Sequence, residues 1–396
     1  MTDSSRLQLT MVEESTFGTT PTDPAMIPIP CTGQSLADQI SYAQSRILQP
    51  NRNVQDLVRL SLGAGGDIPM ELVWGDAASG TSSTIEATYA IVRAAITAAA
   101  ATAVVDVASC TTTAGAKTIT RGSGSFITDG FEVGDVVRTS GSTGAADDGY
   151  QVVTAVVALT LTVARPSNFT GSSGNVTVRR GARLKNGTTD RSFSIEAKHS
   201  DGTSNFHQLF TGMVCDGIEV AVADGQISTL LSRWVGKTST TGTSEGIPGT
   251  PTYPALVSRP VMDCIGVPTF RVAGVDYAAK SIRIATSLAA AARTQIGALG
   301  AQSVRRGSFV VTGAIEAYFS SWTEVDKFRN NMATDILLVT RDSAGRAWSF
   351  SLPEVKYSTG SVRTPGQNDD EFVTLNFQAI VDATEALTMR FQVFDA

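Results

Sequence analysis

A short serine motif is the first feature of the sequence that could support catalysis. Residues 242–246, GTSEG, match G-x-S-x-G, which places a nucleophilic serine on a strained turn between a strand and a helix. No strand pattern precedes this segment, no helical pattern follows it, and both histidines, His199 and His207, lie upstream of Ser244. That order is the reverse of the serine, acid, histidine order of the hydrolases. We therefore predict that Ser244 is not catalytic and that the chain is not an enzyme.

Glycine patterns that could bind nucleotides are incomplete. Residues 236–238, GKT, resemble the end of a phosphate-binding loop, but Leu231 occupies the position of the required first glycine. Residues 122–124, GSG, lack the third glycine of the dinucleotide fingerprint, since Ile127 stands in its place. We predict no cofactor.

Metal binding is also poorly supported. His199 and His207 lie near the turn of a predicted hairpin, yet no cysteine and no obvious carboxylate stands beside them, so we expect ordinary strand positions. The cysteines are scattered without C-x-x-C spacing, which indicates free thiols and neither a zinc site nor a disulfide framework: Cys31, Cys110, Cys215 and Cys264.

The overall composition is that of a globular, strand-rich protein. Of the 396 residues 42% are apolar and 17% are charged, and strand-forming Val, Ile, Phe and Thr recur in alternating patterns. A net charge of −6 argues against tight binding of nucleic acid, which needs clustered Lys and Arg. The N-terminus has no secretion-signal pattern, and the alanine-rich residues 94–105 are too short to span a membrane. We expect an all-β protein with small helices that is made in the cytosol.

The order of predicted elements occurs twice along the chain. Alternating apolar and polar residues predict one hairpin that turns at Asp201-Gly202 and a second that turns between Asp342 and Gly345. A helical segment precedes each hairpin, and a further strand follows it. The strands before the helices carry an acid ahead of an aromatic residue: Glu71 before Trp74, and Glu316 before Phe319. The repeat predicts a duplicated domain, a device of proteins that assemble with copies of themselves.

Each half contains one predicted packing helix. The first has a buried stripe at helical spacing, formed by Ile85, Tyr89, Val92 and Ile96. The second begins with the capping box Ser321-x-x-Glu324 and directs four side chains inward: Trp322, Val325, Phe328 and Met332.

These patterns divide the chain into four parts. Residues 1–104 and 183–238 form a discontinuous first domain, and residues 105–182, which have no counterpart in the second half, form an inserted small β domain that projects from the body. Residues 239–260 are a linker by composition, and residues 261–396 form the second domain. The long irregular stretch 289–307 is expected to reach a neighbouring subunit.

The chain resembles the major tail tube protein of long-tailed bacteriophages over nearly its whole length. The resemblance rests on the order of several stretches: EESTFGTTP (13–21), TGQSLADQISYAQSRILQPNRNVQDL (32–57), DRSFSIEAK (190–198), GSFVVTGAIEAYF (307–319) and FSLPEVKYS (350–358). FEVGDVVRTSGS (131–142) and DDGYQVVTAV (147–156) are similar to a β module found within such proteins.

The resemblance implies a structural virion subunit whose stacked rings form a tube for viral DNA. It implies two tandem tail-tube-type β-sandwich or barrel domains, each with one packing helix, plus the inserted barrel-like domain. With two such folds per chain we expect a homotrimeric, pseudo-hexameric ring, with a homohexamer as the alternative. The implied partners are the chain itself and the tail terminator, tape measure and distal tail proteins, in a virion tail assembled in the host bacterial cytoplasm.

The expected lumen is acidic, so that DNA phosphates pass without specific binding. Glu71 and Glu316, taken as equivalent positions, are the candidate lumen-facing residues. The alternative function is an all-β surface or adhesion protein whose inserted domain binds a host glycan. Exposed aromatic residues in that domain would favour this alternative: Phe126, Phe131, Tyr150 and Phe169.

Overall fold

The structure confirms an all-β protein with small helices. It is a computed structural model that describes residues 6–48, 50, 53, 55–75, 86–364, 366–367 and 369–396. In this part of the chain, strands predominate and the α-helices are short, at Ala87–Ala95 (α1) and Thr323–Arg329 (α2). None of the described helices is long and apolar enough to cross a membrane.

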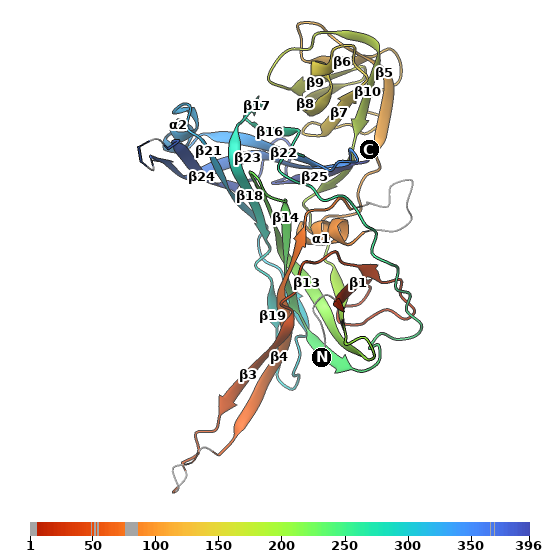
Figure 1. The fold of residues 1–396 in the computed structure, drawn as a ribbon, viewed down its shortest axis with the longest axis vertical. Coiled ribbons are helices and arrows are strands. Elements are labelled where there is room, and N and C mark those ends of the chain that lie inside the picture. The colour runs from red at the N-terminus through yellow and green to blue at the C-terminus, as the bar shows by residue number, and fades with distance from the viewer. Residues whose placement is uncertain are drawn as a thin grey trace.

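A curved sheet of eight strands runs through the molecule, and we call it the long sheet (Figure 1). Its order is β3 (Ala37–Gln44), β4 (Leu57–Glu71), β14 (Thr229–Gly236), β13 (Asn205–Ala223), β18 (Ala279–Ser287), β21 (Val310–Tyr318), β24 (Phe372–Ala379) and β23 (Ala347–Arg363). One face of this sheet packs on the core, and we call the opposite face the open face. Every neighbouring pair is antiparallel.

Two long strands, β13 and β23, pass from the long sheet into second layers. The first part of β13 pairs with β12 (Ser192–Ser200) and β15 (Thr238–Gly242), and β12 continues to β1 (Gln8–Glu14) and β2 (Ile27–Pro28). The first part of β23 pairs with β22 (Ala333–Arg341) and β25 (Arg390–Phe394); beyond them lie β16 (Thr269–Val272), β17 (Val275–Asp276) and β11 (Ala182–Lys185). Both predicted hairpins, β12–β13 and β22–β23, are confirmed.

The two halves follow one strand order and share their irregularities. β4-β14-β13-β12 in the first half corresponds to β21-β24-β23-β22 in the second. β13 has a bulge between Cys215 and Gly217 opposite β14, and β23 has one between Tyr357 and Thr359 opposite β24. Aligning these bulges makes Glu219 correspond to Ser361. Such bulges bend and twist a strand, which helps each long strand leave one layer for the other.

A continuous buried core fills the space between the layers of both halves. In the first half, Phe193 contacts Trp234 edge to face, with ring centroids 5.7 Å apart. In the second, Trp348 contacts Phe391 at 5.0 Å. Folding removes the large apolar surfaces of these aromatic side chains from water, so they contribute strongly to stability.

The first helix is buried on all its faces, whereas the sequence predicted a single buried stripe. All nine residues of α1 are buried, including Arg93, whose guanidinium forms an ion pair with Glu13 at 2.6 Å. Tyr89 and Val92 lie within the helix, and Ile96 is its buried C-cap. Ile85, the first residue of the predicted stripe, lies outside the described residues.

The prediction for the second helix was partly wrong. α2 begins at Thr323 and has Trp322 as its N-cap without a side-chain hydrogen bond, so Ser321 and Glu324 do not form a capping box. Glu324 instead accepts a hydrogen bond from the Tyr357 hydroxyl at 2.7 Å. Val325 is buried, Phe328 packs against the core, and Trp322 and Met332 are 55% and 54% exposed. The helix has only seven residues, so both positions fall outside it and escape its periodicity.

The segment that follows α1 folds as a closed barrel of six strands. Its order is β10 (Ser172–Arg180), β5 (Val105–Thr112), β6 (Thr118–Arg121), β9 (Thr160–Ala164), β8 (Gly149–Val157) and β7 (Val136–Ser140). Figure 1 shows the barrel projecting from the second half, beside β22 and β25. β7 begins at Val136, shortly after the chain turns at Gly134 with a φ of +82°.

Two predicted irregular segments contain strands. The linker begins with β15, whose residues pair with β13. Residues 289–307 contain a small hairpin of β19 (Ala291–Arg293) and β20 (Ser303–Arg305). The segment after the barrel also differs from expectation, since β11 pairs with β25 of the second half.

Candidate assembly surfaces

The residues that could have supported catalysis are not arranged for it. Ser244 is exposed beyond the end of β15, whereas the His207 Nδ1 lies 2.9 Å from Glu196 Oε1 in a buried pair. The Tyr253 hydroxyl donates to Glu196 Oε2 at 2.7 Å, and burial followed by this carboxylate raises the pKa of Tyr253. The contacts fix β12, β13 and the linker together. Sequence reasoning missed Glu196 because its partner comes from the facing strand.

The described residues contain no group of three or more potential metal ligands. His199 is paired with Phe206 and His207 with Lys198. Side chains alternate between the two faces of a strand, so His199 and His207 point to opposite sides of this hairpin. They do not share a metal site.

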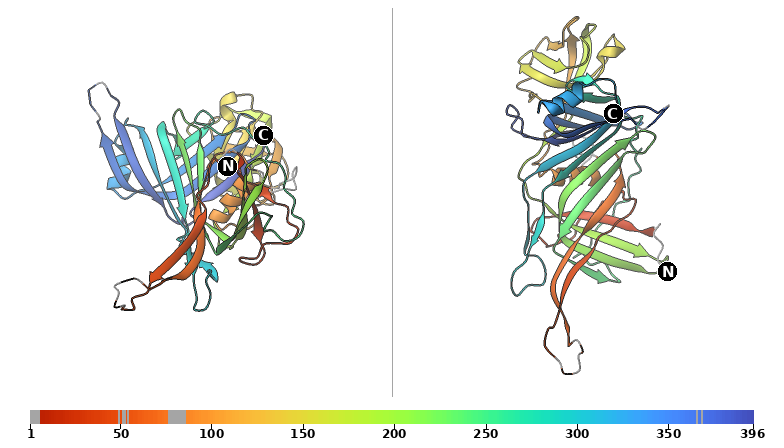
Figure 2. Two further views of the ribbon diagram at one scale, coloured as in Figure 1. Left: turned by 60° about the horizontal axis from the view of Figure 1, so that its bottom comes forward. Right: turned by 90° about the vertical axis from the view of Figure 1, so that its left-hand side faces the viewer.

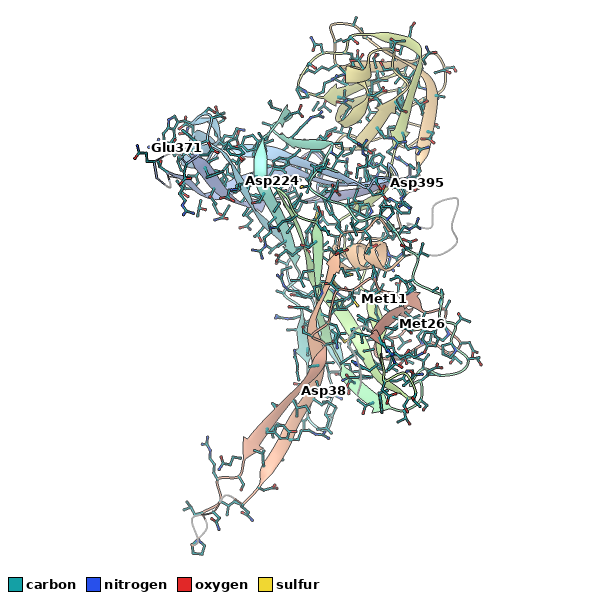
Figure 3. All side chains as sticks on the ribbon, in the orientation of Figure 1. Met11, Met26, Asp38, Asp224, Glu371 and Asp395 are labelled. Carbon is teal, nitrogen blue, oxygen red and sulfur yellow. The ribbon has the colours of Figure 1, made fainter. Side chains whose placement is uncertain are left out.

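The long sheet has an open edge at each end. In the described chain, β3 has a strand neighbour only on its β4 side. Residues 359–363 of β23 pair with β24, and their other side carries no strand among the described residues. Ala37 and Ser361, at these two edges, are exposed. Figure 3 labels Asp38 on β3 and Glu371 beside β24, and they lie at opposite ends of the sheet. Open edges of this kind are templates for pairing with another chain.

An ion-pair cluster spans the middle of the long sheet. On the open face, the Glu219 carboxylate of β13 accepts hydrogen bonds from Arg233 of β14 at 2.7 Å and from Arg283 of β18. The Arg283 hydrogen bond contributes most to lowering the pKa of Glu219. Because β18 belongs to the second half, this carboxylate joins the two halves at the junction of β13 and β18.

Glu71 and Glu316 share the open face but are not equivalent positions. Glu71 follows Gly66 by five residues, whereas Glu316 follows Gly313 by three, and the two glycines occupy matching places in β4 and β21. Glu316 therefore corresponds to Pro69, and Glu71 corresponds to Tyr318. Glu316 lies between Ser281 and Thr374 on the sheet, while Glu71 lines a surface pocket with the linker residues Val257 and Arg259.

A hairpin arm extends from the long sheet. β4 begins at Leu57, and its first part pairs with β3 away from the body. Apolar side chains along the arm are unusually exposed: Tyr42, Ile47, Leu48, Leu57, Val58 and Leu60. The β19–β20 loop extends toward the same side (Figure 2), and the Leu62 amide donates to the Leu299 carbonyl at 2.8 Å. An exposed apolar cluster of this size marks a contact surface.

The barrel does not present an aromatic surface. Phe126, Phe131, Tyr150 and Phe169 are each at most 3% exposed, and they pack in the barrel core or, for Tyr150, against Phe394. The feature that would favour a glycan-binding module is therefore missing from these residues.

Buried charges fasten the barrel to the rest of the chain. Asp135 is fully buried, and both of its carboxylate oxygens accept hydrogen bonds from Arg183 at 2.9 Å. Arg390 of β25 lies 3.4 Å from the same carboxylate. Burial lowers the pKa of the Arg390 guanidinium, and the Asp135 and Glu385 carboxylates oppose that effect.

Comparison with known proteins identifies the family of the chain. No curated protein matches the chain. A sequence model of the family described as "Phage tail tube protein" matches residues 4–379. The match includes the long sheet, both of its open edges and the inserted barrel, so the chain belongs to the phage tail tube protein family and has a structural role in the tail tube.

Proposed function

We propose that three copies of the chain form a ring and that stacked rings form the conduit for viral DNA. The observation that carries this proposal is the correspondence between the two halves of the long sheet. One chain contains a complete junction between similar halves, at β13 and β18, and leaves a free edge at each end of the sheet. Repeated edge pairing closes such a unit into a ring. The division into two tube domains, 1–104 with 183–238 and 261–396, rests on the same correspondence.

Three copies would give six similar half-sheets around the ring. With eight strands from each chain, a trimer closes a barrel of 24 strands. A homohexamer, the alternative, would have twelve half-sheets and a correspondingly wider ring, because barrel diameter grows with strand number.

The open face of the long sheet would line the lumen. Its side chains are mainly small and uncharged, such as Thr312, Thr374 and Ser281, and its central carboxylate, Glu219, balances two arginines. Glu316 lies within this face, and Glu71 lies at its rim beside the linker. A surface without clustered free cations lets DNA phosphates pass without specific binding.

The apolar arm supports ring stacking. In an isolated ring its exposed leucines remain in water, and contact with the adjacent ring would bury them. The tail terminator, the tape measure and the distal tail protein would contact the tube ends or lumen, in a virion tail assembled in the host bacterial cytoplasm. The resemblance to proteins of flexible siphovirus tails supports that setting.

Cryo-electron microscopy of the purified chain tests the proposal. We expect rings of three chains with pseudo-sixfold symmetry, and tubes of stacked rings at higher concentration. Six chains per ring would replace the trimer by the hexamer, and monomers at all concentrations would overturn the assembly function. A variant with Leu57→Ser and Leu60→Ser should form rings that do not stack. Ile127→Ser and Val157→Ser, two exposed apolar positions on the barrel, provide the matched control and should leave stacking unchanged.

A further inference from the structure

We infer that β23 of one copy pairs with β3 of the next copy, with Ser361 opposite Ala37, and that this contact reproduces the β13–β18 junction within the chain. The inference rests on the proposed ring and specifies which strands and which residues close it. The partner surface is thus a second copy of this chain.

The first step identifies the counterparts of the junction strands. β18 precedes and pairs with β21, as β3 precedes and pairs with β4. A Cβ on Gly66 would lie 2.3 Å from the Ser35 carbonyl oxygen, and a Cβ on Gly313 would lie 2.3 Å from the Arg283 carbonyl oxygen. The shared close approach makes Ser35 correspond to Arg283, and hence Ala37 to Ala285. β3 is therefore the counterpart of β18.

The second step transfers the register. Inside the chain, Glu219 of β13 faces Ala285 of β18. Ser361 is the counterpart of Glu219, because the bulges of β13 and β23 align, and Ala37 is the counterpart of Ala285. The edge of β13 that pairs with β18 corresponds to the edge of β23 that has no strand neighbour in the described chain. The transferred register places Ser361 opposite Ala37.

Side-chain charge agrees with this register. It brings Arg363 of one copy opposite Ser35 of the next, and Asp67 lies beyond Ser35 on β4. Arg363 is exposed, and neither its guanidinium nor the Asp67 carboxylate has an ion-pair partner among the described residues. Strands two apart are separated by about 10 Å, which an extended arginine spans when the intervening residue is small. The contact would give both charges a partner.

One difference between β13 and β23 limits the length of the pairing between copies. A Cβ on Gly217 would lie 1.9 Å from the Thr286 carbonyl oxygen, so the internal junction needs glycine there. The counterpart of Gly217 is Thr359, whose side chain prevents that approach. Pairing between copies therefore covers residues 360–364 and 34–38 and stops before Thr359.

Paired cysteines test the register in the assembled protein. The Leu288 amide donates to the Asp216 carbonyl at 2.7 Å, which makes Glu219 and Ala285 a non-hydrogen-bonded pair. Cα atoms of such pairs lie about 4.5 Å apart, within the range that a disulfide bridges. Ala37→Cys with Ser361→Cys should give covalent dimers and trimers on a non-reducing gel, and reductant should return them to monomers. Glu219→Cys with Ala285→Cys, the matched internal pair, should crosslink only within one chain.

The controls separate this inference from the proposed function. Each single-cysteine variant reports the background from the native thiols. Stronger crosslinking of Ser361→Cys with Gln39→Cys than with Ala37→Cys would overturn the register. If trimeric rings form but neither Ser361→Cys with Ala37→Cys nor Ser361→Cys with Gln39→Cys gives a crosslink, the β23–β3 pairing is wrong while the proposed ring stands. If the unmodified chain forms no rings, both the pairing and the proposed ring are wrong. As a second measurement, Arg363→Glu should reduce ring formation at least several-fold, and adding Asp67→Arg should restore it; no rescue would contradict the predicted contact.

Discussion

Glu219 and Arg283 form an ion pair that joins the two halves of the chain across the middle of the long sheet. The same carboxylate also binds Arg233, so one negative charge serves two guanidinium groups. This arrangement keeps two arginines on the open face from presenting free positive charge.

Glu219→Gln should make the lumen retain DNA. The substitution removes the charge that balances Arg233 and Arg283, and free arginines bind phosphate. We expect tubes of the variant to bind duplex DNA more tightly than the unmodified tubes at 50 mM salt, with the difference shrinking at 200 mM, as measured by fluorescence anisotropy. Glu245→Gln changes the charge equally in the exposed linker and should have no such effect. Equal binding by both variants would contradict a lumenal Glu219.

Glu219 should continue to neutralise Arg233 and Arg283 in mild acid. Its pKa lies below the usual glutamate value of about 4.3, because Arg283 and Arg233 stabilise the charged form. The carboxylate is therefore ionised at pH 5 and is neutralised only as the pH falls through the lowered pKa. The difference in DNA binding between unmodified and Glu219→Gln tubes should be constant from pH 7 to pH 5, should keep more than half of its size at about pH 4.3, the usual glutamate pKa, and should be lost only at lower pH. Loss of half of the difference at or above about pH 4.3 would show that the pKa is not lowered.

Gly313→Ala should destabilise the second half. The added Cβ would lie 2.3 Å from both the Arg283 carbonyl oxygen and Phe377 Cζ, so β18, β21 and the core must shift. We expect a loss of about 1–3 kcal/mol in the free energy of unfolding, measured by urea denaturation at one protein concentration. Gly122→Ala, where a Cβ would meet no atom within 4 Å, is the control and should change stability by less than about 0.5 kcal/mol. Similar losses for both would refute the steric explanation.

Asp135→Asn should loosen the barrel from the body. It leaves Arg183 and Arg390 buried without a full counter-charge, which typically costs about 3–5 kcal/mol. Asp106→Asn is the control, because Asp106 also receives two hydrogen bonds from an arginine, Arg179, but its side chain is 44% exposed. Such an exposed pair contributes at most about 1 kcal/mol. Calorimetry should show a lower melting temperature only for Asp135→Asn; equal shifts would contradict a special role for the buried pair.

Local patterns predicted much of the fold. Alternation and turn residues predicted both hairpins, β12–β13 and β22–β23, and the strand-rich insertion. These features depend on neighbours in sequence, which periodicity and turn chemistry describe well.

The failures concern contacts between distant segments. Glu71 and Glu316 looked equivalent because each precedes an aromatic residue by three positions, but register is fixed by β14 and β24 and differs by two residues. Glu196 was missed because Tyr253 and His207 reach it only in the folded chain. The open edges of β3 and β23 also have no signature in the sequence, since an edge is defined by the strand that is missing beside it.

The order of synthesis determines when β11 can pair with its partner strand β25. β11 follows the barrel directly, yet its partner β25 consists of residues 390–394, which are translated long after the barrel. The barrel can thus complete its docking only after β25 has been translated. Likewise, the edge of β13 at residues 219–223 stays uncovered until β18 has been made. A nascent first half therefore displays the kind of edge that β23 keeps in the described structure, and synthesis of β18 covers it.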